Sequence, residues 1–324
     1  MPIDSVSHFG DAAARLRVLV IGDLMLDHYI WGEASRISPE APVPVVEVQR
    51  DTFAAGGAGN AAANLAGLGV NVTLMGSLGS DEHGAAFSAA LQSSGVQLAP
   101  LPPSTKRATI TKTRVMAQRQ QLCRLDREAD PEAFALAPEW KAALDAEPWD
   151  AVLVSDYAKG VVTDDVLATL RIWRSQRSPA PLLALDPKPR RALDCTGFDL
   201  LTPNRSEALQ LAGLPSDTKT AVSDAELCRR IHGRFAPRDL VVTLGAGGLL
   251  LCRNGEVLGR RATVARDVFD VAGAGDTVVA VLTAAFAAGA DLAFAAELAN
   301  RAAGVVVGQV GTVAITRAAL EQGC

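Results

Sequence analysis

The 324-residue sequence is poor in the residues from which zinc sites and disulfide-rich folds are built. Its 4 histidines show no HExxH or similar spacing, and its 5 cysteines include no CxxC pair. Metal sites need closely spaced ligands and disulfide frameworks need an even set of cysteines, so neither is indicated. Separate thiols are therefore predicted at Cys123, Cys195, Cys228, Cys252 and Cys324.

The sequence also lacks an excess of basic residues and a hydrophobic run long enough to cross a bilayer. Lys and Arg number 31 against 36 Asp and Glu, which gives a formal charge of −5. That balance offers no general attraction to nucleic acid or anionic lipid. The apolar stretch 278–290 is too short to span a membrane, and Asp4 and Asp11 stand where a secretory signal carries positive charge. We expect a cytoplasmic protein without a membrane or nucleic-acid partner.

Short β-branched runs alternate with helix-length segments along the chain. The runs typical of buried strands are 17–21, 70–75, 151–154, 182–185 and 240–244. This alternation predicts an α/β fold with a mostly parallel central sheet, helices on both faces and ligands at the carboxyl ends of the strands. No linker divides the chain, so one domain over residues 1–324 is expected, although the length alone also permits two.

Two stretches, 29–53 and 106–127, do not follow this alternation of strands and helices. The first places Pro39, Pro42 and Pro44 around a short apolar run. The second alternates threonine, charged and apolar residues, as an exposed strand does. Together they predict a small β lid, and a plain extension of the sheet with one solvated face is the alternative.

The stretch 106–127 carries seven cations in an otherwise acidic protein, with Asp126 as its acidic residue. They are Lys106, Arg107, Lys112, Arg114, Arg119, Arg124 and Arg127. Strand alternation places Lys112 and Arg114 on one face, and a guanidinium suits a phosphate. The cations indicate a substrate that already carries a phosphate, although such a run can also serve only to keep a surface solvated.

A glycine-rich turn with a carboxylate opens a helix near the C-terminal end of the sequence. Gly273, Ala274, Gly275 and Asp276 precede the apolar run 278–288. The first-turn N–H groups of a helix are unpaired and favour phosphate oxygens. A carboxylate there repels phosphate, which points to Asp276 as the general base that takes a proton from an attacking hydroxyl. Helix capping by this Asp is the alternative.

A second glycine-rich stretch, with Gly56, Gly57 and Asn60, also precedes an Ala-rich helix, 61–68. Ordinary turn formation would explain its glycines, but the two stretches together resemble the two signatures of the PfkB, or ribokinase-like, family of small-molecule kinases. The resemblance implies a ribokinase-like three-layer sandwich with a small β lid. It further implies ATP and Mg²⁺ as cofactors, a monovalent cation as in some relatives, and a homodimer formed through paired lids.

The same resemblance assigns residues to two halves of a site. The expected sugar ligands are Asp27, Gly56, Gly57 and Asn60, to which Lys112 and Arg124 from the basic stretch 106–127 and Lys159 are added. The NxxE motif and the turn after strand 240–244 supply the expected nucleotide ligands, which are Asn204, Arg205, Ser206, Glu207, Thr243, Gly245, Gly247, Gly248 and Asn300. Glu207 is expected to hold Mg²⁺ mostly through water. The segment 299–312, including Gly311 and Thr312, is expected near the adenine.

A finer resemblance covers nearly the whole chain and lies in RISPEAPVPVV at 36–46, QQLCRLD at 120–126 and SDYAKG at 155–160. It points to the heptose kinases of this family, which phosphorylate the anomeric hydroxyl of D-glycero-β-D-manno-heptose 7-phosphate for ADP-heptose and lipopolysaccharide core synthesis. The chain stops at Cys324 without a nucleotidyltransferase domain, so the stand-alone form is expected. Another sugar or nucleoside kinase of the family, or an inactive sugar or nucleotide sensor, stays open.

A dinucleotide oxidoreductase fits the sequence less well. The spacing Gly57-x-Gly59-x-x-Ala62 matches a loose dinucleotide fingerprint. We expect no strand directly before it, however, and Ser77 stands about 20 residues on, where such folds need an acidic residue.

Overall fold

The computed structural model describes residues 5–105, 107–118, 120–128, 134–190, 192–215, 222–265, 268–309 and 311–322. Of the residues singled out above, Asp4, Lys106, Arg119 and Cys324 lie outside these ranges. Among the helices so described, none combines the length and the hydropathy needed to cross a bilayer.

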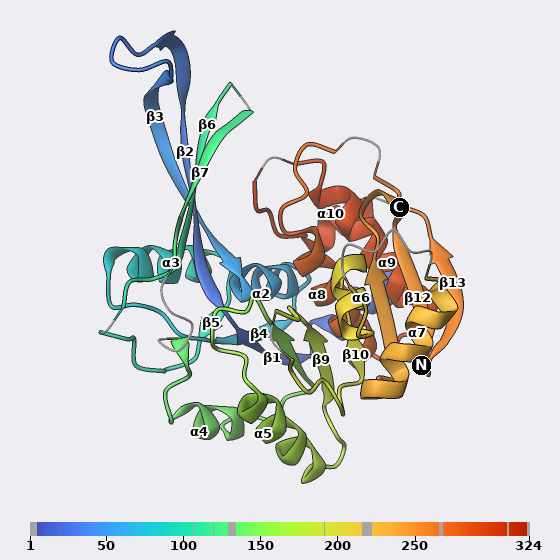
Figure 1. Ribbon diagram of the computed structural model, residues 1–324. Helices are drawn as coiled ribbons and strands as arrows, with labels where there is room; N and C mark the ends of the chain where they lie inside the picture. Colours follow the sequence, from blue (N-terminus) through green and yellow to red (C-terminus); the bar gives the residue numbers. More distant parts are fainter. Residues whose placement is uncertain are drawn as a thin grey trace.

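A nine-stranded sheet forms the centre of the molecule, in the order β13-β12-β11-β10-β9-β8-β1-β4-β5 (Figure 1). Its strands are β1 (Arg17–Gly22), β4 (Asn71–Met75), β5 (Gln97–Leu98), β8 (Ala151–Ser155), β9 (Leu182–Asp186), β10 (Leu200–Leu201), β11 (Asp239–Thr243), β12 (Leu249–Arg253) and β13 (Glu256–Arg261). Neighbours from β11 through β5 pair in parallel, and β12 and β13 add an antiparallel edge. The predicted mostly parallel sheet is confirmed.

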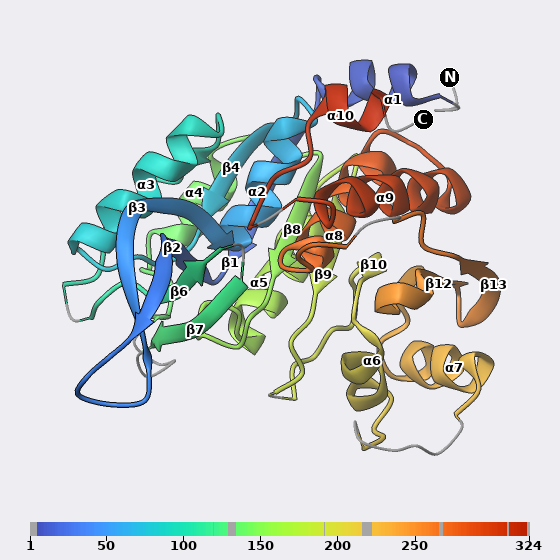
Figure 2. The ribbon, with the colours of Figure 1, turned by 90° about the horizontal axis from the view of Figure 1, so that it is seen from above.

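Helices cover both faces of this sheet and make three layers (Figure 2). They are α1 (Val6–Ala13), α2 (Ala58–Gly67), α3 (Glu82–Ser93), α4 (Trp140–Asp145), α5 (Asp164–Ser175), α6 (Arg205–Leu211), α7 (Asp224–Phe235), α8 (Ala274–Ala287), α9 (Leu292–Val306) and α10 (Arg317–Gln322), with a 3₁₀ turn, η2, at Gly245–Gly247. Side chains of β1 alternate between the two layers: Val18 and Val20 pack with α2, α8 and α9, whereas Leu19 and Ile21 pack with α5 and α7. This alternation is the reason that the strand reads as an uninterrupted apolar run.

A separate four-stranded sheet, in the order β3-β2-β6-β7, forms the lid and projects from the body (Figure 1). Its strands are β2 (Leu24–Ile37), β3 (Pro44–Gly57), β6 (Thr111–Ala117) and β7 (Gln120–Arg127). The predicted lid is confirmed, but its first two strands are longer than the stretch 29–53. They reach into the body, where β2 starts beside the end of β1 and β3 runs directly into α2.

Two sequence-based expectations are wrong in this fold. A disulfide joins Cys228 on α7 to Cys252 on β12, where separate thiols were predicted, because packing brings a helix and a strand together that the spacing of the two residues does not reveal. Cys123 and Cys195 are free, as expected. A strand, β3, does stand directly before the Gly57-x-Gly59 spacing. That strand belongs to the lid rather than to the central sheet, so the context of a dinucleotide site is still missing.

Candidate functional site

A cavity of about 650 Å³ lies at the carboxyl ends of β8, β9, β10 and β11 and against the start of α8. Of the predicted nucleotide ligands, it is lined by Asn204, Glu207, Thr243, Gly245, Gly248 and Asn300. Gly273, Ala274, Gly275 and Asp276 line it as well. The cavity therefore brings together the helix start and the nucleotide motifs, which the sequence separates widely.

The turn before α8 requires glycine at position 273 for two reasons. Gly273 has φ 80°, a backbone conformation that other residues rarely adopt. A Cβ atom on it would also lie 2.5 Å from the amide nitrogen of Asn60. Gly275 has open space around it, so a ligand can approach the backbone of the first turn closely.

Asp276 is buried in that first turn, with 5% of its surface exposed. Its Oδ1 accepts a hydrogen bond from the hydroxyl of Tyr157 at 2.6 Å, and its Oδ2 accepts one from the amide of Asn60 at 2.8 Å. Burial raises the pKa of Asp276 to about 6, against the lowering effect of these two donors; Asp27 raises it slightly further. A carboxylate with this pKa is ionised at neutral pH and is basic enough to take a proton during a reaction.

A polar network behind Asn60 fixes the amide that holds Asp276. The side chain of Asn64, one turn along α2, donates to the carbonyl and side-chain oxygens of Asn60, at 2.8 and 3.2 Å. Its own Oδ1 accepts from the hydroxyl of Thr277 and the N–H of Ile315. Asn64 and Thr277 are fully buried, so the start of α8 is tied to α2 by hydrogen bonds as well as by packing.

The NxxE motif forms the start of α6. Asn204 caps the helix by accepting from the N–H of Glu207, and Glu207 Oε2 accepts from the N–H of Asn204 in return. Glu207 Oε1 also pairs with Lys188 at 2.5 Å. The motif is therefore a capping box with a lysine beside it, at the edge of the cavity.

The charges of this cavity suit a divalent cation bound with a triphosphate. Burial and the nearby carboxylates of Glu207 and Asp276 raise the pKa of Asp186 well above its usual range. The raised pKa favours the protonated, uncharged form of Asp186, while Glu207 pairs with Lys188. In the part of the chain described, no group of three or more His, Cys, Asp or Glu side chains forms a ready metal site. Glu207, in the lining of the cavity, is the carboxylate that the sequence predicts to hold Mg²⁺ mostly through water.

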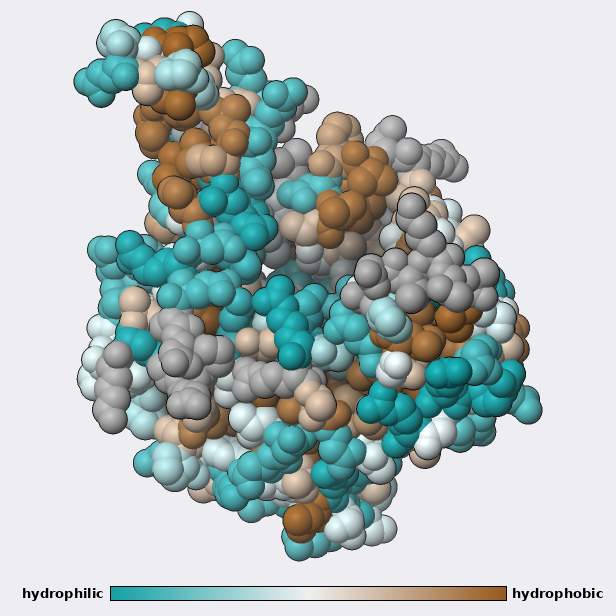
Figure 3. Space-filling model, viewed as in Figure 1, coloured by the Kyte–Doolittle hydropathy of each residue, from teal (hydrophilic) through white to brown (hydrophobic). Residues whose placement is uncertain are grey.

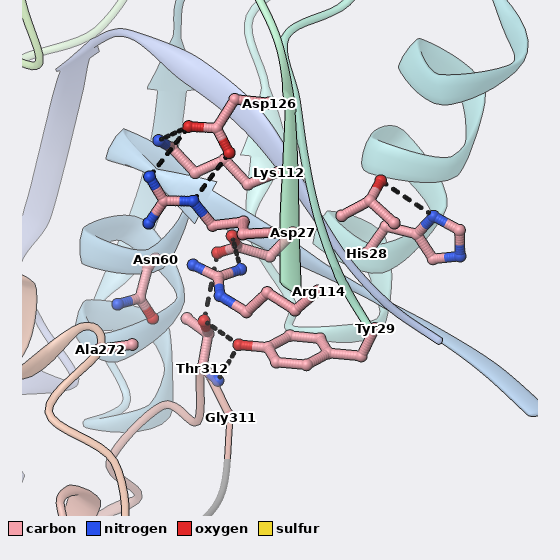
Figure 4. A network of polar contacts seen from close by, with 12 residues as sticks. Asp27, His28, Tyr29, Asn60, Lys112, Arg114, Asp126, Ala272, Gly311 and Thr312 are labelled. Carbon is pink, nitrogen blue, oxygen red and sulfur yellow. Dashed lines mark hydrogen bonds and ion pairs between the residues drawn. The ribbon is translucent and has the colours of Figure 1, made fainter. Parts of the chain in front are cut away.

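Several predicted nucleotide ligands lie away from the cavity. Arg205 pairs with Asp224 of α7, Ser206 is exposed, and Gly247 lies in η2 outside the cavity lining. Gly311 and Thr312 were expected near the adenine, but Thr312 donates to Asp27, and the N–H of Gly311 donates to Asp270. Both residues therefore lie on the lid side, near Tyr29 and Asp27 (Figure 4).

On the lid side, Asp27 and Arg114 form a buried ion pair at 2.5 Å (Figure 4). Thr312 donates to the other oxygen of Asp27 and contacts the hydroxyl of Tyr29. A Cβ atom on Gly56 would lie 2.4 Å from that carboxylate, so glycine is needed for close approach and not only for a turn. A second cavity, of about 360 Å³, adjoins this cluster, with Tyr29, Arg114 and Asp270 in its lining.

The predicted phosphate ligands of the lid already have carboxylate partners. Lys112 and Arg124 share Asp126, at 3.6 and 2.8 Å, and Figure 4 shows the Lys112 pair beside Asp27. Lys159 pairs with Glu128 at 2.6 Å. A substrate phosphate would have to compete with these carboxylates.

Arg107 differs from the other lid cations. Its side chain is buried against the ring of Phe134 and donates to Ser77, whereas its Nε and Nη1 have no hydrogen-bond partner among the described residues. Burial lowers the pKa of this guanidinium to about 10. Phe134 belongs to the same apolar cluster as Met25, Ile110 and Tyr157, so Arg107 packs against the cluster that also supports the tyrosine next to Asp276. Two buried donors without acceptors are costly and suit an anion.

Sequence reasoning assigned no role to four polar groups that the structure brings into the site. Tyr157, Asp186 and Lys188 line the main cavity, and Asn64 supports Asn60. Asp186 and Lys188 directly follow a predicted strand and were therefore expected among the polar residues at the carboxyl ends of the strands, but without a specific role. Tyr157 lies in the stretch SDYAKG that carries the finer resemblance, but the contacts of Tyr157 with Asp276 and of Asn64 with Thr277 join distant segments and have no signal in a single sequence.

Comparisons with known proteins agree on one family. Residues 15–318 match the model of the pfkB family of carbohydrate kinases. The chain is 44% identical over 310 residues to the bifunctional protein HldE of Trichlorobacter lovleyi. The matched region covers 94% of this chain and 62% of that protein. It is 42% identical over 328 residues to HldE of Methylobacillus flagellatus, over 99% of this chain and 65% of that protein. The chain thus spans less than two thirds of these relatives.

Solved structures show the same fold. Ribokinase of Arabidopsis thaliana, complexed with ribose and ATP, matches with a TM-score of 0.70 and 20% identity, over 95% of this chain and 98% of that one. Phosphofructokinase-2 of Escherichia coli, in complex with substrates and products, matches with a TM-score of 0.73 and 18% identity, over 95% and 97%. The ribokinase-like fold predicted from the sequence is confirmed.

The raised pKa of Asp276 predicts a pH-dependent cost to stability. The folded protein holds this proton up to about pH 6, whereas the unfolded chain loses it near pH 4, so stability falls as the pH rises between these values. Asp276→Asn removes that loss. Relative to the wild type, the free energy of unfolding of the variant should rise by about 3 kcal/mol over the whole titration of Asp276. Roughly half of this rise should fall between pH 5 and pH 8. Urea unfolding of both proteins across this range measures the gain, and parallel pH dependences would contradict it.

Proposed function

Because the chain belongs to the pfkB family of carbohydrate kinases, we propose that it transfers the γ-phosphoryl group of ATP to the anomeric hydroxyl of D-glycero-β-D-manno-heptose 7-phosphate. The observation that carries the proposal is Asp276, buried at a helix start that faces the main cavity, with both carboxylate oxygens held by fixed donors. The finer choice of substrate is supported by the stretches 36–46, 120–126 and 155–160 and by the relatives named HldE.

In this mechanism, Asp276 takes the proton of the sugar hydroxyl as its oxygen attacks the γ-phosphorus. The O–H bond breaks, a new O–P bond forms, and the bond to ADP breaks, which leaves a 1,7-bisphosphate. The first-turn N–H groups of α8 stabilise negative charge on the group in transfer. Lys188 and Glu207 would face the triphosphate, and Mg²⁺ held there through water would offset its charge. Closure of the lid would exclude water as a competing acceptor.

The proposed reaction predicts which sugar is phosphorylated and how far the rate falls when Asp276 is replaced. With ATP and Mg²⁺, heptose 7-phosphate should be turned over in preference to fructose 6-phosphate, ribose and adenosine, and phosphorus NMR should place the new phosphate at C1. Asp276→Asn should lower kcat at least about 10²-fold with little change in ATP affinity, because only the proton acceptor is lost.

The outcomes of that assay separate the alternatives. Turnover of another sugar would leave Asp276 as the proposed general base but would contradict heptose 7-phosphate as the substrate. Binding of both ligands without product would favour an inactive sensor. Near-normal turnover by Asp276→Asn would remove Asp276 from the mechanism.

We further propose that Arg107 binds the phosphate that the sugar already carries, since its Nε and Nη1 lack acceptors. Lys112, Arg124 and Lys159 stay proposed as weaker contacts because each already pairs with a carboxylate. Arg107→Gln should raise KM for heptose 7-phosphate by at least about tenfold with KM for ATP unchanged. Lys112→Gln and Arg124→Gln should have smaller effects. A residue whose replacement leaves the sugar KM unchanged is not a ligand, and a thermal melt checks that each variant is folded.

The lid is proposed to pair with the lid of a second copy. Large apolar side chains gather on it although the solvent reaches them (Figure 3). They include Ile37, Val43, Val48, Phe53, Leu122 and Leu125. Such a cluster on a projecting sheet is typical of a protein interface.

Light scattering should therefore give twice the chain mass at micromolar concentration, and Leu125→Asp should give the monomer, because a charge would be buried in the interface. Ile172→Asp is the matched control, since Ile172 is equally exposed but lies on α5, away from the lid. A wild-type monomer, or a dimer that persists in Leu125→Asp, would contradict this interface.

A further inference from the structure

Tyr157 is the polar neighbour of Asp276 to which no sequence motif gave a role. It lies on the loop between β8 and α5, and its hydroxyl donates to Asp276 Oδ1 at 2.6 Å. It also lines the main cavity, next to the place where a phosphoryl group would meet the base. Its hydroxyl is thus the direct link between this loop and the carboxylate.

The backbone of the loop is fixed by two buried aspartates. The carboxylate of Asp23 accepts hydrogen bonds from the N–H groups of Tyr157, Lys159 and Val161, at 2.8, 3.0 and 3.0 Å. Asp156 accepts from the N–H of Ala158, which holds φ 56°. Because Asp23 itself follows β1, the loop is anchored to the centre of the sheet and not to the solvent.

The ring of Tyr157 is fixed as well. It packs against the cluster of Met25, Ile110 and Phe134, which comes from the lid strand β2 and the segments that flank β6 and β7. A phenylalanine could keep all of these apolar contacts. The hydroxyl therefore contributes the bond to Asp276, and the rest of the side chain contributes its position.

The charges around Asp276 make this bond one-directional. Burial and the neighbouring Asp276 carboxylate raise the pKa of the phenol well above its usual value, so Tyr157 stays protonated and donates. The other groups that act on Asp276 are Asn60 of α2, a neutral donor, and the carboxylate of Asp27. Burial and the Asp27 carboxylate favour the protonated base, and the two donors oppose them.

We propose that Tyr157 is a positioning residue for the general base: its hydroxyl fixes one oxygen of Asp276 and keeps the carboxylate ionised and turned toward the acceptor hydroxyl. This role rests on the kinase reaction proposed above. Asn60 and Tyr157 then divide the task, because each holds one oxygen from a different element of the fold.

A measurement without turnover tests the bond. The chain has 2 tyrosines, Tyr29 and Tyr157, so labelling with [ζ-¹³C]tyrosine gives two signals, and Tyr157→Phe identifies its own by loss. In the free protein, the Tyr157 signal should shift with a midpoint near pH 6 as Asp276 ionises, and Asp276→Asn should abolish that shift. The Tyr29 signal serves as the internal control because its hydroxyl contacts Thr312. A Tyr157 signal that is flat between pH 5 and pH 8, or that shifts equally in Asp276→Asn, would overturn the assignment.

A kinetic measurement tests the role. Tyr157→Phe keeps the ring but removes a donor to the charged carboxylate, so the acidic limb of kcat against pH should move up by about one pH unit. On the plateau, kcat should fall by less than about tenfold and KM for ATP should stay unchanged. A side chain that only supports the fold would leave the limb in place in the phenylalanine variant, and that result would overturn the role. If the wild type phosphorylates no sugar, the proposed reaction fails, while the carbon-13 titration still decides the bond.

Discussion

The site depends on one ionised carboxylate held in a buried position. Burial raises the pKa of Asp276, and the donors Asn60 and Tyr157 limit that rise. The carboxylate is therefore still ionised at neutral pH. The three residues come from α8, α2 and the loop after β8, so the base exists only when three separate parts of the chain are packed together. Ionisation of Asp276 destabilises the folded protein, because burial disfavours the charged form.

Other ionisable side chains of the main cavity lie close to Asp276. Asp186 and Glu207 stand near Asp276, and Lys188 is the cation that faces them. In the reaction proposed above, a triphosphate would add negative charge to this cavity. A divalent cation bound with it would offset that charge, so a carboxylate in a capping box could serve a phosphate site.

The sequence predicted the scaffold better than the contacts. The strands around β1, β8, β9 and β11 were found because strands buried on both faces are continuous apolar runs. The helix start at Asp276 followed from local glycine chemistry. Alternation also placed Lys112 beside Arg114, but it could not show that Asp126 and Asp27 would neutralise them from neighbouring strands. Tyr157 and the Cys228–Cys252 bond were missed for the same reason, since each joins elements whose packing no local pattern encodes.

The course of the lid strands explains why two distant glycine motifs work as one. Strand β3 leaves the lid and becomes α2 at Gly57, so Gly56 lies against Asp27 while Asn60, one turn later, reaches Asp276. Gly273 in turn leaves just enough room for the amide of Asn60. Asn60 thus joins the lid strand to the start of α8, because it belongs to the helix that the lid strand continues into and donates to Asp276 on the helix that it faces. In the proposed reaction, this contact would link the element that encloses the substrate to the residue that takes the proton.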